Sequence, residues 1–289
     1  MTDDATSAVR LLLKWEFPPL LEEIPQSPKE LRVRGVLPSF DKRWLAVVGS
    51  RAMSPYGRQA CDYLIKGLAG YPVVIVSGLA YGVDAQAHRS ALDAGLPTVG
   101  VPGSGLDWDV MYPKANVKLA HEILEKGGAL LSEEKSDAKT MDHMFPKRNR
   151  IMAGMCHATL VIEAREKSGS LITAKYTTDY NRDLLVVPGS IFSAESKGTH
   201  QFLRLGAVAV TTPEDILQAL GITPSASNVA TRADLSSNEI RVVELIATPL
   251  PRDELIRSLA MPTAEANALL SMMEIKGIII EDRGVFRVR

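Results

Sequence analysis

The chain has 289 residues, of which 46% are hydrophobic and 23% are charged, and its formal net charge is −1. This balance is typical of a folded globular protein, because disordered chains carry fewer apolar residues and a larger net charge. It excludes a protein that coats nucleic acid through a basic surface spread over the whole domain, so a nucleic-acid site would need locally concentrated cations. The two cysteines are far apart and the five histidines lack paired metal spacing, so we expect neither a disulfide framework nor a metal centre.

Residues 1–40 precede the first predicted strand of the main domain and contain the stretch FPPLLEEIPQSP. Because proline disrupts helix interiors, we expect this lead-in to lack a long helix and to pack against the main domain. The first residues are acidic, and no apolar run approaches the roughly 18 residues that a membrane span needs. We therefore expect a cytoplasmic protein without a membrane segment.

Between residues 41 and 222, short β-branched runs alternate with stretches of helical spacing. Several of the runs are apolar on both faces, which is typical of buried parallel strands. The predicted strands are Leu45–Val48, Val73–Ser77, Thr98–Val101, Ala129–Ser132, Thr159–Glu163, Leu184–Val187 and Val208–Thr211. Helical patterns cover Tyr56–Gly70, Val83–Ala94 and Val117–Lys126. Repeated alternation of strand and helix predicts an α/β fold with a doubly wound parallel sheet.

The composition changes near residue 223. Residues 223–236 are small and polar, which predicts a flexible linker. Helical patterns then follow at Asn238–Ala247, Arg252–Leu259 and Thr263–Ile275, and Gly277–Arg289 alternates like a hairpin. Three short helices followed by a hairpin predict a small winged-helix-like domain over 237–289.

The first strand-to-helix turn reads VVGSRAMSP, with Gly49 and Ser50 at its start and Arg51 after them. In open α/β sheets this edge binds ligands, and the following helix start offers free N–H groups to a phosphate. A guanidinium is also suited to phosphate oxygens. The turn matches neither GxGxxG nor GxxxxGK[ST], so we expect no dinucleotide cofactor and no Walker-type ATP hydrolysis. A tight turn with a solvated Arg51 is the alternative interpretation.

The segment FPKRNRIMAGM concentrates cations beside an aromatic ring. Lys147, Arg148 and Arg150 surround Asn149 and follow Phe145 closely. On a helix, Lys147 and Arg150 share one side while Arg148 turns away from them. Single-stranded nucleic acid needs such groups, because cations pair with its phosphates and rings stack on its bases. The helix dipole disfavours cations at a helix start, so the cluster favours an anionic ligand over a solvated charged face.

A second turn, EAREKSGSLITA, places Ser168, Gly169 and Ser170 at the start of a helix. Hydroxyl groups there cap the helix or donate to a phosphate. No His–Asp pair accompanies them, so a nucleophilic serine is not predicted. In the turn GLAYGVDAQAH, we assign Asp84 and His88 to helix capping and packing in preference to catalysis.

Taken in order, these motifs resemble the DNA-processing protein A (DprA/Smf) family. The resemblance spans about residues 16–220 and the small C-terminal domain. It is carried by VVGSR at 47–51, IVSGLAYGVDAQAH at 75–88, GLDWDVMYP at 105–113, LLSEE at 130–134, FPKRNRIMAGM at 145–155, VIEAREKSGSLITA at 161–174 and VVPGS at 186–190.

The resemblance implies an extended Rossmann-type domain over 41–222 that binds single-stranded DNA without catalysing a reaction. It further implies a homodimer that loads the RecA recombinase onto incoming DNA and protects that DNA during natural transformation. The implied DNA-binding residues are Gly49, Ser50, Arg51, Phe145, Lys147, Arg148, Asn149, Arg150, Ser168, Gly169 and Ser170. Phe145 is the stacking candidate among them, and Glu163 is expected to orient neighbouring cations.

Two other functions remain open on the same Rossmann variant. Hydrolases that cleave the N-glycosidic bond of nucleoside monophosphates resemble PGGxGTxxE at the turn where this chain has KSGSLITA, which lacks the acid. A nucleotide-sensing regulator would read promoters with its winged helix, but Thr263–Ile275 contains no Lys or Arg to contact phosphates. We therefore expect a protein-contact or accessory role for the C-terminal domain.

Overall fold

The computed structural model describes residues 8–223, 236–246, 250–275, 278–282 and 284–288. The chain divides into two compact units, Met1–Asn228 and Val229–Arg289. The predicted linker 223–236 lies almost entirely outside the described residues, as does one residue of the predicted hairpin turn, position 283. The two units are therefore described one at a time.

The first unit is built on one nine-stranded sheet with the spatial order β1-β2-β6-β5-β4-β3-β7-β8-β9. The seven strands from β6 to β9 in this order run parallel to one another, whereas β2 pairs antiparallel with β6 and β1 pairs antiparallel with β2. Their bounds are β1 Arg10–Leu11, β2 Arg32–Gly35, β3 Arg43–Val48, β4 Val73–Ser77, β5 Thr98–Gly100, β6 Ala129–Ser132, β7 Ala158–Val161, β8 Asp183–Val186 and β9 Val208–Ala209. The predicted α/β fold with a mostly parallel sheet is confirmed.

The lead-in forms part of this sheet, which the sequence did not reveal. Strand β2 pairs with β6, with Val33 opposite Leu131, and β1 pairs with β2 at the sheet edge. The helical pieces between them are short, η2 Lys14–Glu16 and α1 Pro19–Glu22, as the prolines predict. The side chains of Leu21 and Ile24 are buried in the core of the sheet. The predicted packing of the lead-in against the main domain is therefore confirmed.

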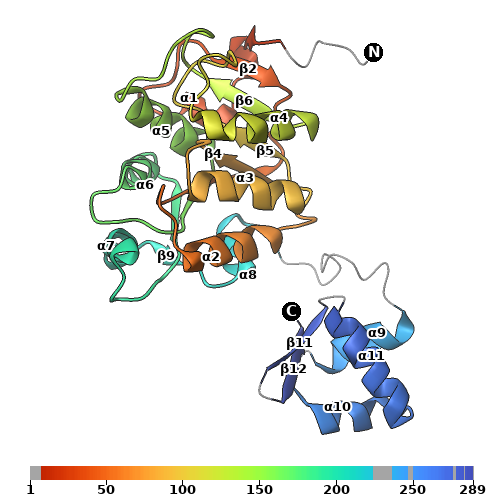
Figure 1. The fold of residues 1–289 in the computed structure, drawn as a ribbon. Coiled ribbons are helices and arrows are strands. Elements are labelled where there is room, and N and C mark those ends of the chain that lie inside the picture. Colours follow the sequence, from red (N-terminus) through yellow and green to blue (C-terminus); the bar gives the residue numbers. More distant parts are fainter. Residues whose placement is uncertain (1–7, 224–235, 247–249, 276–277, 283, 289) are drawn as a thin grey trace, which may run out of the picture. The chain divides into compact units, whose positions relative to one another are not determined.

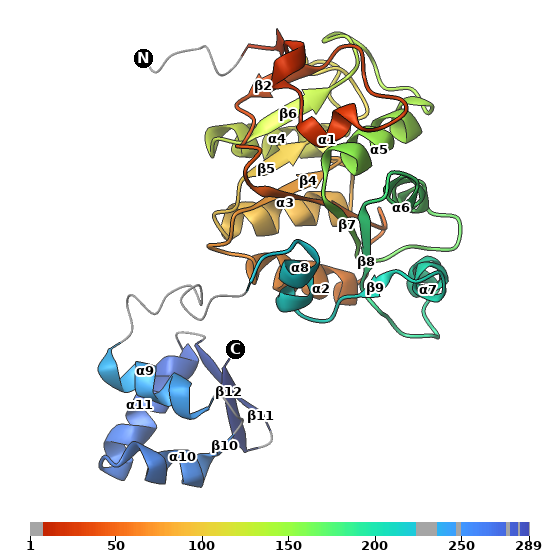
Figure 2. The ribbon, with the colours of Figure 1, turned by 180° about the vertical axis from the view of Figure 1, so that it is seen from behind.

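Helices cover both faces of the sheet (Figure 1). One row consists of α2 Pro55–Lys66, α3 Val83–Asp93, α4 Val117–Glu125 and α8 Pro213–Ala219. The other consists of α5 Met144–Met155, α6 Ser170–Asp179 and α7 Lys197–Arg204, with α1 beside α5 (Figure 2). The short turns η3 Lys114–Asn116 and η4 Ala194–Ser196 precede α4 and α7. In the part of the chain that the structure describes, no helix is long and apolar enough to cross a membrane.

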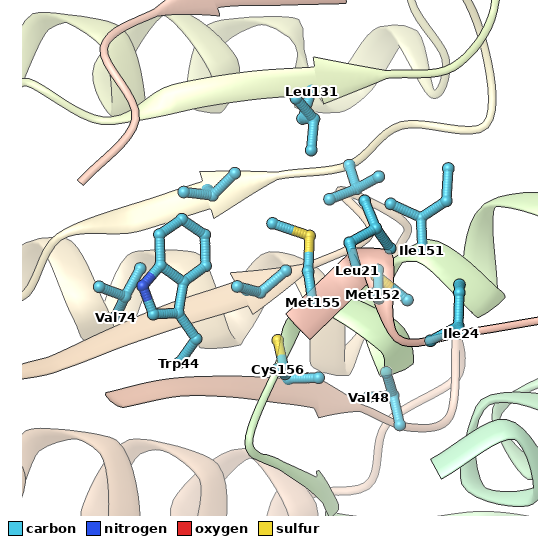
Figure 3. Close-up of a cluster of buried hydrophobic side chains, with 14 of the residues drawn as sticks. Leu21, Ile24, Trp44, Val48, Val74, Leu131, Ile151, Met152, Met155 and Cys156 are labelled. Carbon is cyan, nitrogen blue, oxygen red and sulfur yellow. The ribbon is translucent and has the colours of Figure 1, made fainter. Parts of the chain in front are cut away.

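Alternate residues of β3 are buried in two separate cores, one on each face of the sheet. Trp44, Ala46 and Val48 are buried among α1 and α5, while Leu45 and Val47 are buried among α2 and α3. Figure 3 shows the first core, which includes Trp44 of β3 and Met155 of α5. This division follows from the side-chain period of two in a strand that is buried on both faces.

The strand order reverses beside β3. From β3 the chain moves outward through β4, β5 and β6, and then returns to pair β7 with the other side of β3. Connections leave β3 and β7 in opposite directions, which opens a crevice at the carboxyl ends of the strands, the usual place for a ligand in such sheets. This reversal positions the candidate site.

The second unit has its own core, which includes Leu255 and Phe286. Its helices are α9 Ser237–Leu245, α10 Arg252–Leu259 and α11 Thr263–Ile275. A small sheet joins β10 Leu250–Pro251, β12 Val285–Val288 and β11 Ile279–Asp282, in that spatial order. Three helices with a hairpin confirm the predicted winged-helix arrangement, and β10 adds a short third strand.

Candidate functional site

A pocket of about 560 Å³ opens in the crevice formed by the carboxyl ends of β3, β4 and β7. All of the predicted DNA-binding residues line it except Lys147 and Arg150. Those that do are Gly49, Ser50, Arg51, Phe145, Arg148, Asn149, Ser168, Gly169 and Ser170. Segments separated by about a hundred residues in sequence therefore meet at one site.

The turn after β3 forms one wall of this pocket. A side chain at Gly49 would bring its Cβ within 2.6 Å of Val83 Cγ2, so α3 can approach only a glycine here. Ser50 is buried, and its hydroxyl accepts a hydrogen bond from Ala52 N at 3.2 Å. Arg51 is exposed, and its guanidinium carbon lies 4.8 Å from the centre of the Phe145 ring. This cation–π contact holds the Arg51 charge at the mouth of the pocket.

Arg148 lies deeper in the pocket than Arg51. It is only 7% exposed, and its Nη1 donates to Val101 O at 2.7 Å and lies 4.0 Å from Asp84 Oδ2. Burial is the main reason that the pKa of Arg148 falls to about 10; the Asp84 carboxylate opposes this shift, and the positive charge of Arg51 contributes to it. Arg148 is therefore still a cation at neutral pH.

Asp84 sits beside Arg148 and not at the cap of its helix. It is in the first turn of α3, and its Oδ2 accepts from Gly78 N at 3.1 Å. Burial raises the pKa of Asp84, while the Arg148 charge and hydrogen bonds from Ala80 and Gly78 oppose that rise. A Cβ at Gly78 would lie 1.4 Å from Arg148 Nη1, so the glycine leaves room for the guanidinium.

The start of α6 forms the opposite wall. Ser168 and Ser170 bring their hydroxyl oxygens within 2.7 Å of each other, and Asn149 Nδ2 donates to Gly169 O at 3.3 Å. Ser170 is the first residue of the ten-residue helix α6, so its positive dipole end adjoins the pocket. A helix start next to cations is favourable for a phosphate group.

Lys147 and Arg150 lie on the other side of α5, as the helical period predicts. Lys147 Nζ is 2.8 Å from Glu134 Oε1, and Arg150 Nη2 is 2.6 Å from Glu133 Oε2. Both cations line a separate hollow of about 540 Å³ against the lead-in, where Arg150 also donates to Gln26 O. Neither cation therefore lines the pocket that contains Arg51 and Arg148, because Glu133 and Glu134 engage both elsewhere, and their contact with DNA stays a prediction.

Two cations of the pocket were missed from the sequence. Arg165 and Lys167 line it, and both are exposed. Both residues precede the SGS turn in EAREKSGS and follow a predicted strand, and this position could have indicated from the sequence that they belong to the pocket. Arg165 also donates from Nε to Glu195 Oε1 at 2.5 Å. Four of the lining residues are cations, and one, Asp84, carries a carboxylate, so the lining has an excess of positive charge.

Glu163 does not orient cations as expected. It is 3% exposed and accepts hydrogen bonds from Ser54 N at 2.9 Å and from Ser54 Oγ at 2.5 Å. A Cβ at Gly57 would lie 2.3 Å from Glu163 Oε2, so the carboxylate packs directly against the first turn of α2. Glu163 therefore fixes the start of α2, and Ser54 in turn caps that helix by accepting from Gly57 N.

Potential metal ligands are scattered. In the residues that the structure describes, no group of three or more His, Cys, Asp or Glu side chains is placed to hold a metal ion. Cys61 and Cys156 are buried thiols, and burial raises the pKa of both. Both cysteines therefore pack in the core as protonated thiols.

Comparison with known proteins assigns the chain to a family. Residues 9–221 match the family described as DNA recombination-mediator protein A. This chain belongs to the DNA recombination-mediator protein A family. Residues 226–284 match the DprA winged helix domain, which agrees with the architecture of the second unit.

Individual members of the DNA recombination-mediator protein A family are similar over most of the first unit. DNA processing protein DprA of Streptococcus pneumoniae is 41% identical over 201 residues, which cover 70% of each protein. Protein Smf of Escherichia coli is 40% identical over 204 residues, 71% of this chain but 54% of that protein. The chain thus matches about half the length of the Escherichia coli relative.

Solved structures of family members share the fold. The crystal structure of Streptococcus pneumoniae DprA superposes with a TM-score of 0.67 at 37% identity, covering 75% of this chain and 77% of that one. The Helicobacter pylori protein superposes with a TM-score of 0.65 at 29% identity, covering 74% of this chain and 96% of that one. That structure concerns the single-stranded DNA binding mode of the Helicobacter pylori protein.

Proposed function

We propose that this chain is a cytoplasmic, non-catalytic recombination mediator that binds single-stranded DNA through the pocket between β3 and β7. The observation that carries the proposal is the convergence of Arg51, Arg148, Arg165 and Lys167 with the start of α6. Such a set binds phosphate, because cations and helix-start amides both favour its negative charge. The Helicobacter pylori relative, whose described activity is single-stranded DNA binding, supports this choice.

The positions of Arg51 and Arg148 suit a flexible nucleic-acid strand. Arg51 is exposed at the mouth, whereas Arg148 is buried beside Asp84. A strand that is free of its complement can bend a phosphate into the pocket toward Arg148 while neighbouring phosphates stay near Arg51. A duplex holds its backbone too rigidly to do so. We therefore assign single-stranded DNA as the ligand and Arg51 as its main outer contact.

The homodimer is part of the proposal. Strand β9 is an edge of the sheet, and Val208 on it and Leu205 just before it are 49% and 80% exposed. Phe192, in the loop before α7, is 92% exposed. Exposed apolar side chains of this size are typical of protein contacts. A Leu205→Ser change should shift sedimentation toward the monomer if this edge is the interface.

Loading of RecA onto incoming DNA completes the proposal and rests on membership of a family of recombination mediators. The α11 helix of the second unit, which carries no Lys or Arg, suits an accessory protein contact better than duplex reading. A strand-exchange assay with RecA on DNA covered by single-strand-binding protein tests this part. The proposal requires that added protein shorten the lag, and an unchanged lag contradicts it.

No reaction is part of the proposal. The Ser168 and Ser170 hydroxyls contact each other, and Thr173 and Ala174 follow where the related hydrolases have their acid. Incubation with AMP separates the alternatives, because an N-glycosidase releases free base and a mediator does not.

Binding of the same oligonucleotide in single-stranded and duplex form, measured across salt concentration, tests the main proposal. The protein should prefer the single strand, and Arg51→Ala should weaken binding for all sequences alike and reduce the salt slope by about 1. Lys147→Ala is the matched control, because Lys147 is a nearby cation outside the pocket. Equal affinities of Arg51→Ala and the parent protein across the salt series would refute the assignment.

A further inference from the structure

An exposed aromatic ring stands at the rim of the pocket. Tyr112 is 42% exposed, and its ring centre lies 6.2 Å from that of Phe145, with 58° between the ring planes. Phe145 lines the pocket, whereas Tyr112 lies just outside the lining residues. Tyr112 is therefore an exposed aromatic neighbour of a ring that lines the pocket.

The Phe145 ring, the stacking candidate from the sequence, is already engaged. The Arg51 guanidinium lies over it at 4.8 Å, and a Cβ at Gly103 would come within 2.7 Å of its Cδ1. Phe145 is also half-buried. The ring thus serves to position Arg51, and Tyr112 is its solvent-exposed aromatic neighbour.

The backbone holds Tyr112 in place. The preceding residue, Met111, is buried, and the nearby Asn116 donates from Nδ2 to Leu79 O at 2.8 Å and to Ala80 O at 3.1 Å. Ala80 itself lines the pocket, so Asn116 ties the Tyr112 loop to the pocket wall. A tyrosine whose backbone is already fixed loses less conformational entropy when a flat ligand stacks on its ring than a tyrosine on an unrestrained loop.

We propose that Tyr112 stacks an unpaired nucleobase of the strand whose phosphates the pocket binds. The inference rests on the proposed function and adds a base subsite to it. Every base has a π-face, so this contact tolerates any sequence. Bases inside a duplex are already stacked on both faces, so the same contact favours single strands. The subsite neutralises no phosphate, and it therefore adds affinity without adding salt dependence.

Affinity for a short oligothymidylate tests the subsite with three variants. Tyr112→Ala should weaken binding about fivefold or more, the value expected for loss of one stacked base. Tyr112→Phe should bind like the parent protein, because the ring is kept. Tyr63→Ala is the matched control, since Tyr63 is a 54% exposed tyrosine on α2 that lines a different hollow. The salt slope of Tyr112→Ala should equal that of the parent, whereas Arg51→Ala lowers it.

A series of oligonucleotides with one abasic position supplies a readout that needs no change in fold. The parent protein should bind an oligonucleotide with one particular abasic position more weakly than the intact one. Tyr112→Ala should bind these two oligonucleotides with equal affinity. If Tyr112→Ala binds like the parent while Arg51→Ala binds weakly, the base subsite is wrong and the proposed function stands. If the parent protein itself fails to bind single strands, both are wrong.

Discussion

Asp84 and Arg148 form a buried pair of opposite charges beside the candidate DNA pocket. Asp84 Oδ2 lies 4.0 Å from Arg148 Nη1, and the two residues are 6% and 7% exposed. Removal of one partner from such a pair leaves the other charge buried without compensation. The stability of the first unit and its binding chemistry are therefore coupled through these two side chains.

Replacement of Arg148 by methionine should lower the free energy of unfolding of the first unit by about 3–5 kcal/mol, because Asp84 loses its counter-charge. The double change Asp84→Asn with Arg148→Met should restore part of that loss. The three tryptophans, Trp15, Trp44 and Trp108, all belong to the first unit, so their fluorescence during urea unfolding reports on it. A double variant no more stable than the single one would show that the pair is not coupled.

Two glycines, Gly78 beside the pocket residue Arg148 and Gly169 in the pocket wall, should respond differently to alanine. Gly78→Ala places a methyl group 1.4 Å from Arg148 Nη1, so it should displace the guanidinium and weaken both folding and DNA binding. Gly169→Ala meets nothing within 4 Å and has an ordinary φ of −62°, so it should fold normally. Thermal unfolding of the two variants gives the comparison, and equal melting temperatures would contradict it.

The buried His88 should make the first unit sensitive to acid. Its Nδ1 lies 2.7 Å from Thr98 Oγ1, and burial, aided by the charges of Arg148 and Arg89, lowers the pKa of His88 from 6.5 to about 3. Thr98 donates its own hydroxyl proton to Ile75 O, so Nδ1 is the donor in that contact.

Because the pKa of His88 is lower in the folded protein than in the unfolded chain, the unfolded chain binds more protons at mildly acidic pH. The contribution of His88 is therefore fully present above about pH 6.5 and is lost as the pH falls toward 3. Between pH 6.5 and 5 the loss should be about 2 kcal/mol. Urea unfolding at these pH values should show a shallower pH dependence in His88→Gln than in the parent protein. If the free energy of unfolding falls with pH equally in His88→Gln and in the parent protein, other groups cause the acid sensitivity.

Arg150 should contribute to the free energy of unfolding and contribute little to the affinity for DNA. Its side chain is 8% exposed, pairs with Glu133 at 2.6 Å and donates to Gln26 O in the lead-in. Arg150→Ala should therefore cost about 3 kcal/mol or more of unfolding free energy. In contrast, Lys147→Ala should cost about 1 kcal/mol or less, because the Lys147 side chain is 42% exposed and its ion pairs are screened by solvent. Denaturant unfolding of both variants tests the ranking.

The order of strands along the chain predicted the walls of the pocket. Gly49–Arg51 and Ser168–Ser170 each follow a strand that is apolar on both faces, and carboxyl ends of parallel strands meet at one edge. The positions of Lys147 and Arg150 could not be predicted in the same way. Their pairing with Glu133 and Glu134 depends on how α5 packs beside the end of β6, which is a contact between distant segments.

The fold was predictable where hydrophobic periodicity is long enough to recognise. Strands such as Val73–Ser77 are continuous apolar runs and were found. Strands β1 and β2 escaped notice because Arg10–Leu11 has two residues and Arg32–Gly35 carries charged residues at alternate positions. β2 is a strand because the edge of β6 is free to pair with it, and β1 in turn pairs with β2. The local sequence pattern contains no information about that edge.

The lead-in has a consequence for synthesis on the ribosome. Its apolar side chains, including Leu21 and Ile24, pack against α5, and Gln26 is bound by Arg150, 124 residues further along the chain. The lead-in thus leaves the exit tunnel well before the helix against which it packs. Until α5 emerges, those side chains stay accessible to chaperones and proteases. Docking of the lead-in therefore waits for a part of the chain that is synthesised after it.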